Sequence, residues 1–139
     1  MVTRRGKLAQ VGFGTVNLVS AVLVGLGVFV GLPTRYWLID VPAVVVIMLL
    51  GAAGVGLLVR RAWGVPVARV ASIVTLVLGL LLVGTLAVTV SYLWGIYGPV
   101  GRGGAVILTL VAALALPYLV VLPAVQLLWL GPPSRIAKG

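Results

Sequence analysis

The sequence VASIVTLVLGLLLVGTLAVTV, Val70–Val90, runs for 21 residues without one charged side chain. An α-helix rises about 1.5 Å per residue, so about 20 apolar residues are needed to cross the hydrocarbon core of a membrane. Buried strands of similar composition end after about 4–8 residues, at a turn signal. A stretch of this length therefore predicts a membrane-spanning helix and excludes a strand.

Further apolar runs lie on both sides of this stretch. A soluble helical protein would need a polar face on most of its helices, and none of these runs has one. Short segments containing Gly, Pro and Arg separate the runs, so consecutive helices are expected to lie antiparallel. The sequence predicts an all-α integral membrane protein, with residues 1–139 forming a single domain of four transmembrane helices in an up-down bundle. The predicted spans are Leu8–Leu32, Leu38–Val59, Pro66–Trp94 and Gly103–Leu130.

The composition supports a lipid environment and excludes most catalytic chemistry. Apolar residues make up 63% of the chain and charged residues 8%, against about 45–50% and about 25% in soluble domains. The chain has no His and no Cys, and its one acidic residue is Asp40. The chain alone therefore cannot build a metal centre, a thiol nucleophile or a His-based acid–base pair. We predict no enzymatic activity, no cofactor and no metal ion.

The basic residues predict the orientation, because Lys and Arg that flank a span remain on the cytoplasmic side. This rule places both termini and the second connection in the cytoplasm, and the protein in a plasma membrane, which we expect to be a bacterial inner membrane. The first run is too long for a signal peptide and lacks a cleavage site, so we expect it to be retained. Eight basic residues lie on the predicted inner side (Arg4, Arg5, Lys7, Arg60, Arg61, Arg69, Arg135 and Lys138) and two on the outer side (Arg35 and Arg102).

The net charge of +9 predicts attraction to anionic lipid headgroups on the cytoplasmic side. The basic residues are spread over short segments and form no patch suited to a duplex, so no nucleic acid is expected as a partner. Four tryptophans lie close to predicted helix ends, where indole rings prefer the membrane interface. We expect them to act as interfacial anchors; they are Trp37, Trp63, Trp94 and Trp129.

Few polar residues lie inside the runs. Asp40, at the start of the second run, is expected to cap that helix or to form an ion pair with Arg35, with an ion or proton site as the alternative. Asn17 lies well inside the first run and is expected to hydrogen-bond a neighbouring helix, with substrate binding as the alternative. Gln126, near the inner end of the fourth run, is expected to reach headgroups or water.

Small residues let transmembrane helices approach closely. Glycines recur in the first and second runs, and Thr75 lies at a depth similar to that of Asn17. The residues expected to pack helices together are Asn17, Gly27, Gly31, Gly51, Gly54, Gly56 and Thr75.

Two prolines interrupt the fourth run. Pro117 and Pro123 each remove one backbone hydrogen bond and are expected to bend the helix. We interpret the bend as static shape, with a hinge or an ion-coordinating break as the alternative.

The lack of catalytic residue types and the apolar predicted helices favour a function through contact with other membrane proteins. We expect a non-catalytic integral membrane subunit that packs against, stabilises or regulates a larger membrane protein complex, with other membrane protein subunits as partners. One alternative is a small homo-oligomeric channel or carrier, favoured by Asn17 and the prolines but opposed by the lack of a charge that could select an ion. A further alternative is a lipid-binding membrane protein that uses the basic rim.

Overall fold

The computed structural model describes residues 4–31 and 34–130, and all regular structure within them is helical. The described residues include four helices that are long and apolar enough to cross a membrane, which confirms that part of the prediction. The predictions made for Leu32 and for residues 131–139, including Arg135 and Lys138, lie outside the described residues.

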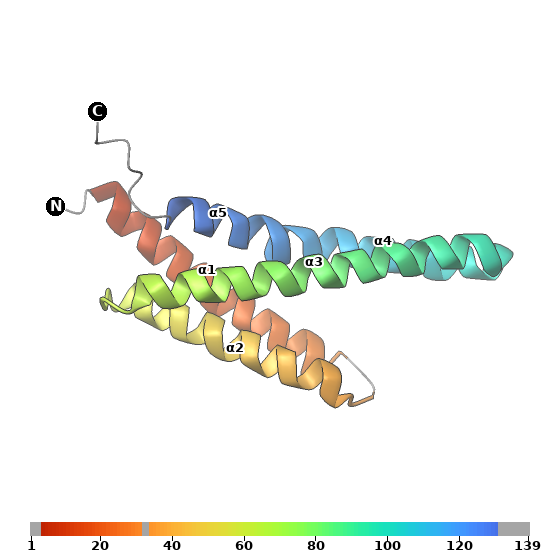
Figure 1. Cartoon of the computed structure of the whole chain (residues 1–139), viewed down its shortest axis with the longest axis horizontal. Helices are drawn as coiled ribbons and strands as arrows, with labels where there is room; N and C mark the ends of the chain where they lie inside the picture. The colour runs from red at the N-terminus through yellow and green to blue at the C-terminus, as the bar shows by residue number, and fades with distance from the viewer. Residues whose placement is uncertain (1–3, 32–33, 131–139) are drawn as a thin grey trace. The chain divides into compact units, whose positions relative to one another are not determined.

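The helices follow one another with short connections (Figure 1). The last predicted span is one continuous helix, Gly98–Trp129, that contains a wider π-helical segment. The elements are α1 Arg4–Phe29, α2 Trp37–Leu58, α3 Gly64–Ile96, α4 Gly98–Leu116, η1 Pro117–Val121 and α5 Leu122–Trp129. The chain divides into two compact units, residues 1–73 with 126–139, and residues 74–125.

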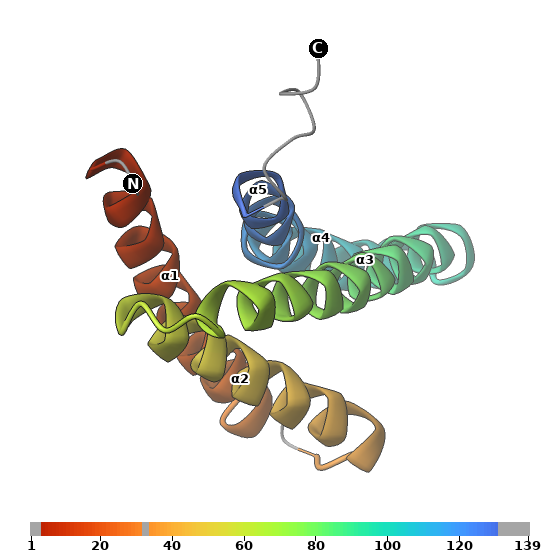
Figure 2. The ribbon, with the colours of Figure 1, turned by 60° about the vertical axis from the view of Figure 1, so that its left-hand side comes forward.

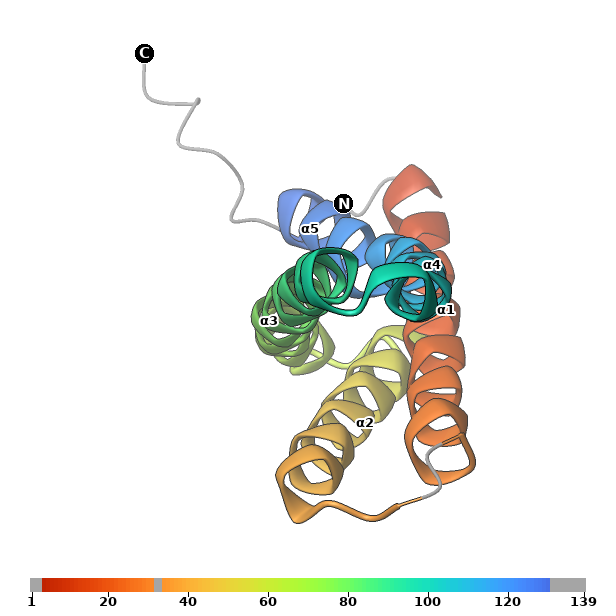
Figure 3. The same cartoon turned by 90° about the vertical axis from the view of Figure 1, so that its right-hand side faces the viewer.

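In the first unit, α1 and α2 form a helical hairpin, seen side by side in Figures 1 and 3. Their backbones meet at two glycines. A Cβ atom on Gly54 would lie 2.9 Å from the Gly14 carbonyl oxygen, and a Cβ on Gly14 would lie 3.1 Å from the Gly54 carbonyl oxygen. Leu18 and Leu58 pack beside this crossing. The apolar core around it comes mainly from α2, with Ala43, Val46, Leu50, Ala53 and Leu57.

In the second unit, the outer part of α3 runs beside α4 (Figures 1 and 2). Gly98, with a φ of 55°, supports the tight turn between them. Near that turn, Gly101 packs against Leu93 of α3 and against Tyr97, the N-cap residue of α4. Few side chains are buried in this hairpin, so most of its apolar surface is open to lipid or to a partner.

The π-helical segment shows how the chain accommodates Pro117. Within η1 the backbone widens, and the Leu122 N–H donates to the carbonyl of Pro117, five residues earlier. A π-bulge is one way in which an α-helix accommodates an interruption of its i→i−4 backbone hydrogen bonds. Pro123 lacks the N–H that would bond the Leu119 carbonyl. That oxygen lies against Gly79 of α3, at a position where any Cβ would clash.

Candidate functional site

The most polar buried site of the first unit is a chain of three side chains from three helices. Ser72 Oγ of α3 donates to Gln126 Oε1 of α5 at 2.9 Å. Gln126 Nε2 then donates to Asn17 Oδ1 of α1 at 2.7 Å. These side chains are almost completely buried. The cluster of Asn17, Ser72 and Gln126, called the polar cluster below, therefore ties α1, α3 and α5 together inside an otherwise apolar chain.

The ends of the helices that carry the polar cluster are held by two further contacts. Arg69, three residues before Ser72, donates through Nε to the backbone carbonyl of Leu130 at the end of α5. A cation at a helix C-terminus satisfies a free carbonyl and interacts favourably with the helix dipole. The Phe13 and Trp129 rings meet edge-on with centroids 6.3 Å apart. These two contacts hold the C-terminal end of α5, and with it Gln126, against α1 and α3.

The polar cluster leaves hydrogen-bonding capacity unused. Asn17 Nδ2 and Ser20 Oγ, on the same face of α1, are buried and have no partner in the described part of the chain. The exposed hydroxyls behave differently: Thr15, Thr85, Thr89 and Ser91 each donate to the carbonyl four residues earlier. The buried site can thus form further hydrogen bonds with a polar guest such as water, because the Asn17 Nδ2 group can donate and the Ser20 hydroxyl can donate or accept.

The sequence located part of this site. Asn17 makes the interhelical hydrogen bond expected of it. The expectation that Gln126 reaches headgroups or water is wrong, because that side chain is 1% exposed and both ends of its amide are bonded. Ser72 was not anticipated, although its spacing offered a signal: Arg69, Ser72 and Thr75 recur every three residues, which places polar groups on one face of a helix. Thr75 is buried in the second unit, and its hydroxyl has no partner among the described residues.

The glycines predicted to pack helices differ in their surroundings. Gly54 lies at the α1–α2 crossing, and a Cβ on Gly56 would meet the Trp63 ring at 2.7 Å and the Gly64 Cα at 2.8 Å. A Cβ on Gly27 or Gly51 would meet nothing within 4 Å, and one on Gly31 would meet only its own helix at Gly27. No neighbouring helix of the described chain therefore uses these three positions, because the hairpin makes its closest approach at Gly14 and Gly54 instead. Gly14 was missed, as were Gly79 and Gly101.

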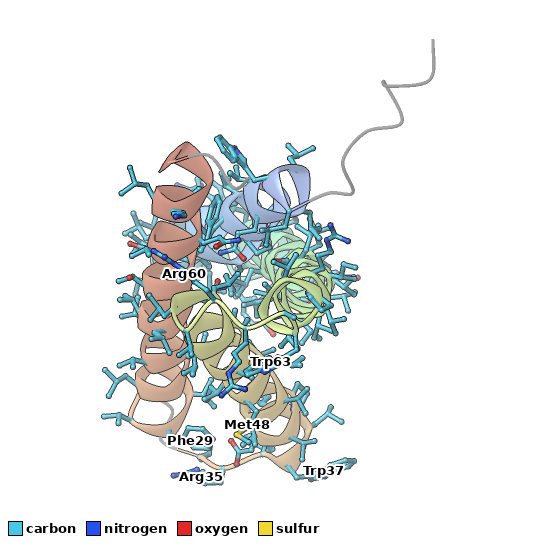
Figure 4. All side chains as sticks on the ribbon, turned by 90° about the vertical axis from the view of Figure 1, so that its left-hand side faces the viewer. Phe29, Arg35, Trp37, Met48, Arg60 and Trp63 are labelled. Carbon is cyan, nitrogen blue, oxygen red and sulfur yellow. The ribbon has the colours of Figure 1, made fainter. Side chains whose placement is uncertain are left out.

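Of the two roles expected for Asp40, the structure shows the ion pair and not the cap. Helix α2 begins at Trp37, its N-cap residue is Tyr36, and no side chain caps it. Asp40 lies in the first turn and pairs with Arg35 at 3.9 Å, while Arg35 also lies over the Phe29 ring, 4.9 Å from its centroid (Figure 4). Asp40 does not cap the helix because α2 begins at Trp37, four residues before the Val41 start that an N-cap at Asp40 would require.

The predicted anchors lie where helices end. Trp37 begins α2, Trp63 immediately precedes α3, Trp94 lies two residues before the end of α3, and Trp129 ends α5. Each indole is well exposed, and Arg102 lies over the Trp94 ring at 5.9 Å. Their anchoring in a membrane interface remains a prediction, as does a bend or hinge at Pro117 and Pro123.

Comparisons with models of protein families, with curated proteins and with solved structures return no match to this chain.

Proposed function

We propose that the protein is a non-catalytic integral membrane subunit that packs against, stabilises or regulates a larger membrane protein complex. The proposal places the four helices in an up-down bundle in a plasma membrane, a bacterial inner membrane, with both termini in the cytoplasm. The excess of basic residues in the tails and the second connection supports this orientation. The observation that carries the proposal is a row of small residues on the outer half of α3.

This row, called the small-residue stripe below, consists of Gly84, Ala87, Ser91 and Gly95. Spacings of three and four residues keep it on one helix face. All four residues are exposed, and a Cβ on Gly84 or Gly95 would meet nothing within 4 Å. The Ser91 hydroxyl is bonded to the Ala87 carbonyl of its own helix, so the stripe presents little polarity.

A stripe of this kind favours contact with another transmembrane helix, because small residues let backbones approach and gain dispersion energy. The chain uses the same principle internally where Gly14 meets Gly54. On α3 no helix of the second unit fills the equivalent space, so we assign it to a helix of a partner protein. The lack of His, Cys and Glu supports a role through contact and not through chemistry.

Photo-crosslinking in native membranes tests this assignment. A photoreactive amino acid replacing Ser91 should yield an adduct with a different membrane protein. The matched control replaces Leu82, an exposed residue nine positions earlier, about 180° around the helix, and should yield lipid adducts only. Lipid adducts alone from Ser91, or an adduct with a second copy of the chain, would contradict the proposal.

The polar cluster favours one alternative, a small homo-oligomeric channel or carrier. Buried amide and hydroxyl groups with unused hydrogen-bonding capacity could line a path for a polar solute. Purified protein reconstituted alone in liposomes would then show selective solute flux, and Asn17→Leu would abolish it. The subunit proposal expects no such flux.

A further inference from the structure

The turn between α2 and α3, Val59–Trp63, has a backbone that suits glycine but carries arginine. Arg60 adopts a φ of 55°, in the left-handed region that L-residues disfavour. Its N–H donates to the Leu57 carbonyl at 3.2 Å, and the Arg61 N–H donates to the Gly56 carbonyl at 3.1 Å. This pair of bonds is the Schellman motif, in which glycine usually takes the place that Arg60 occupies here. The chain thus keeps a long cationic side chain at a position where it strains the backbone.

Arg60 and Arg61 also differ from the other arginines with described side chains, because neither has a side-chain partner among the described residues. Of the arginines whose side chains the structure describes, Arg35 pairs with Asp40, Arg69 bonds the Leu130 carbonyl and Arg102 lies over Trp94. Asp40 is the sole acidic residue of the chain. The guanidinium groups of Arg60 and Arg61 are exposed and have no side-chain carboxylate to bind. Two adjacent positive charges of this kind are suited to an external anion, and phosphate oxygens match the guanidinium fork.

An apolar surface lies directly beside this charge. Trp63 belongs to the same turn (Figure 4) and is 44% exposed. One edge of its indole packs on α2 at Gly56, where the absence of a side chain makes room for the ring. The turn thus carries an indole packed at one edge and, two and three residues before it, two exposed arginines, which together provide an apolar contact and an anion site within one short turn. This combination corresponds to the boundary between the headgroup and the acyl chains of a phospholipid.

We propose that Arg60 and Arg61 bind the phosphate of an anionic phospholipid, whose glycerol and upper acyl region packs against Trp63. The binding free energy of the lipid offsets the backbone strain at Arg60. A free phosphate ion could meet the same two guanidinium groups but would leave Trp63 without a contact. The site rests on the membrane placement that the proposed function assumes, but not on the small-residue stripe. The lipid experiment below and crosslinking at Ser91 therefore succeed or fail independently.

The experiment measures the thermal unfolding midpoint of the purified full chain in a neutral detergent, with added lipid or salt. Phosphatidylglycerol should raise the midpoint of the wild type, whereas equal amounts of phosphatidylcholine or inorganic phosphate should not. Arg60→Gly should raise the midpoint without lipid, because glycine relieves the left-handed strain. The same variant should lose more than half of the phosphatidylglycerol shift. Arg61→Gln should also lose that shift, without the gain in basal stability.

Arg102→Gln is the matched control, since it removes an exposed arginine that lies beside a different tryptophan. It should keep the full phosphatidylglycerol shift. The proposal is overturned if Arg60→Gly and Arg61→Gln both keep that shift, or if phosphatidylcholine stabilises the wild type equally. A shift produced by inorganic phosphate alone would overturn the assignment to a lipid.

Discussion

Replacing Gly54 by alanine should separate α1 from α2 at their closest approach. The new Cβ would lie 2.7 Å from Leu18 Cγ and 2.9 Å from the Gly14 carbonyl oxygen, whereas ordinary Cβ contacts begin at 3.4 Å. The shortfalls are 0.7 Å (3.4 − 2.7) and 0.5 Å (3.4 − 2.9). One of the two obstructing atoms is backbone, so the helices must move and cannot simply change a rotamer.

The free energy of unfolding should fall as a result. Overpacking in a well-packed core costs about 1–3 kcal/mol, and alanine returns about 1 kcal/mol through its higher helix propensity. We expect Gly54→Ala to destabilise the protein by about 0–2 kcal/mol. The control is Gly51→Ala on the same helix, where the added Cβ meets nothing within 4 Å. That variant should be unchanged or more stable by up to about 1 kcal/mol.

Unfolding in mixed micelles of increasing dodecyl sulfate fraction, followed by far-ultraviolet circular dichroism, measures both variants under one condition. The two should differ by about 1–3 kcal/mol, the overpacking cost that only Gly54→Ala carries, with Gly54→Ala the less stable. Equal stabilities, or a more stable Gly54→Ala, would refute the close crossing of α1 and α2.

Three other substitutions test separate features of the structure. Gly79→Ala should destabilise the chain by about 1–3 kcal/mol, because its Cβ would meet the Leu119 backbone, whereas Gly84→Ala should not; thermal unfolding in detergent compares them. Asn17→Leu should cost about 1–3 kcal/mol by removing the acceptor of the buried Gln126 Nε2 group, and a double variant with Gln126→Leu should cost less than the sum of the single changes in the same assay. Asp40→Asn should change stability by about 1 kcal/mol or less, since its ion pair is long and only partly buried; a larger loss would show that the carboxylate has a role beyond this pair.

The sequence predicted the helices well because a chain in lipid can satisfy its backbone hydrogen bonds in few ways. An unbroken apolar run has to satisfy its own backbone, so Val70–Val90 could only be helical. Helix ends were harder to place, since polar residues can continue a helix beyond the apolar run. Asp40 illustrates this limit, because it lies inside the first turn of α2 and not before it.

The sequence predicted only part of the polar cluster, because it identified Asn17 as a packing residue but not its partners Gln126 and Ser72. The depth of Asn17 marked it as a packing residue, but its partners depend on which helix faces α1, and periodicity does not specify that. Gln126 lies close enough to a helix end to suggest contact with water, yet it is buried, because its amide bonds Ser72 and Asn17 and Arg69 holds the carbonyl of nearby Leu130. Spacing alone likewise could not separate Gly54, which meets another backbone, from Gly51, which meets none.

Purification from the native membrane in a mild detergent tests most directly whether the protein acts by contact. The wild-type chain and Gly51→Ala should each co-purify with a second membrane protein at a fixed ratio. Gly95→Leu should lose that partner while keeping its own thermal stability, because a Cβ at Gly95 meets nothing in the chain itself. A wild-type preparation that contains only copies of this chain, or a partner that Gly95→Leu retains in full, would contradict the proposed role of the small-residue stripe.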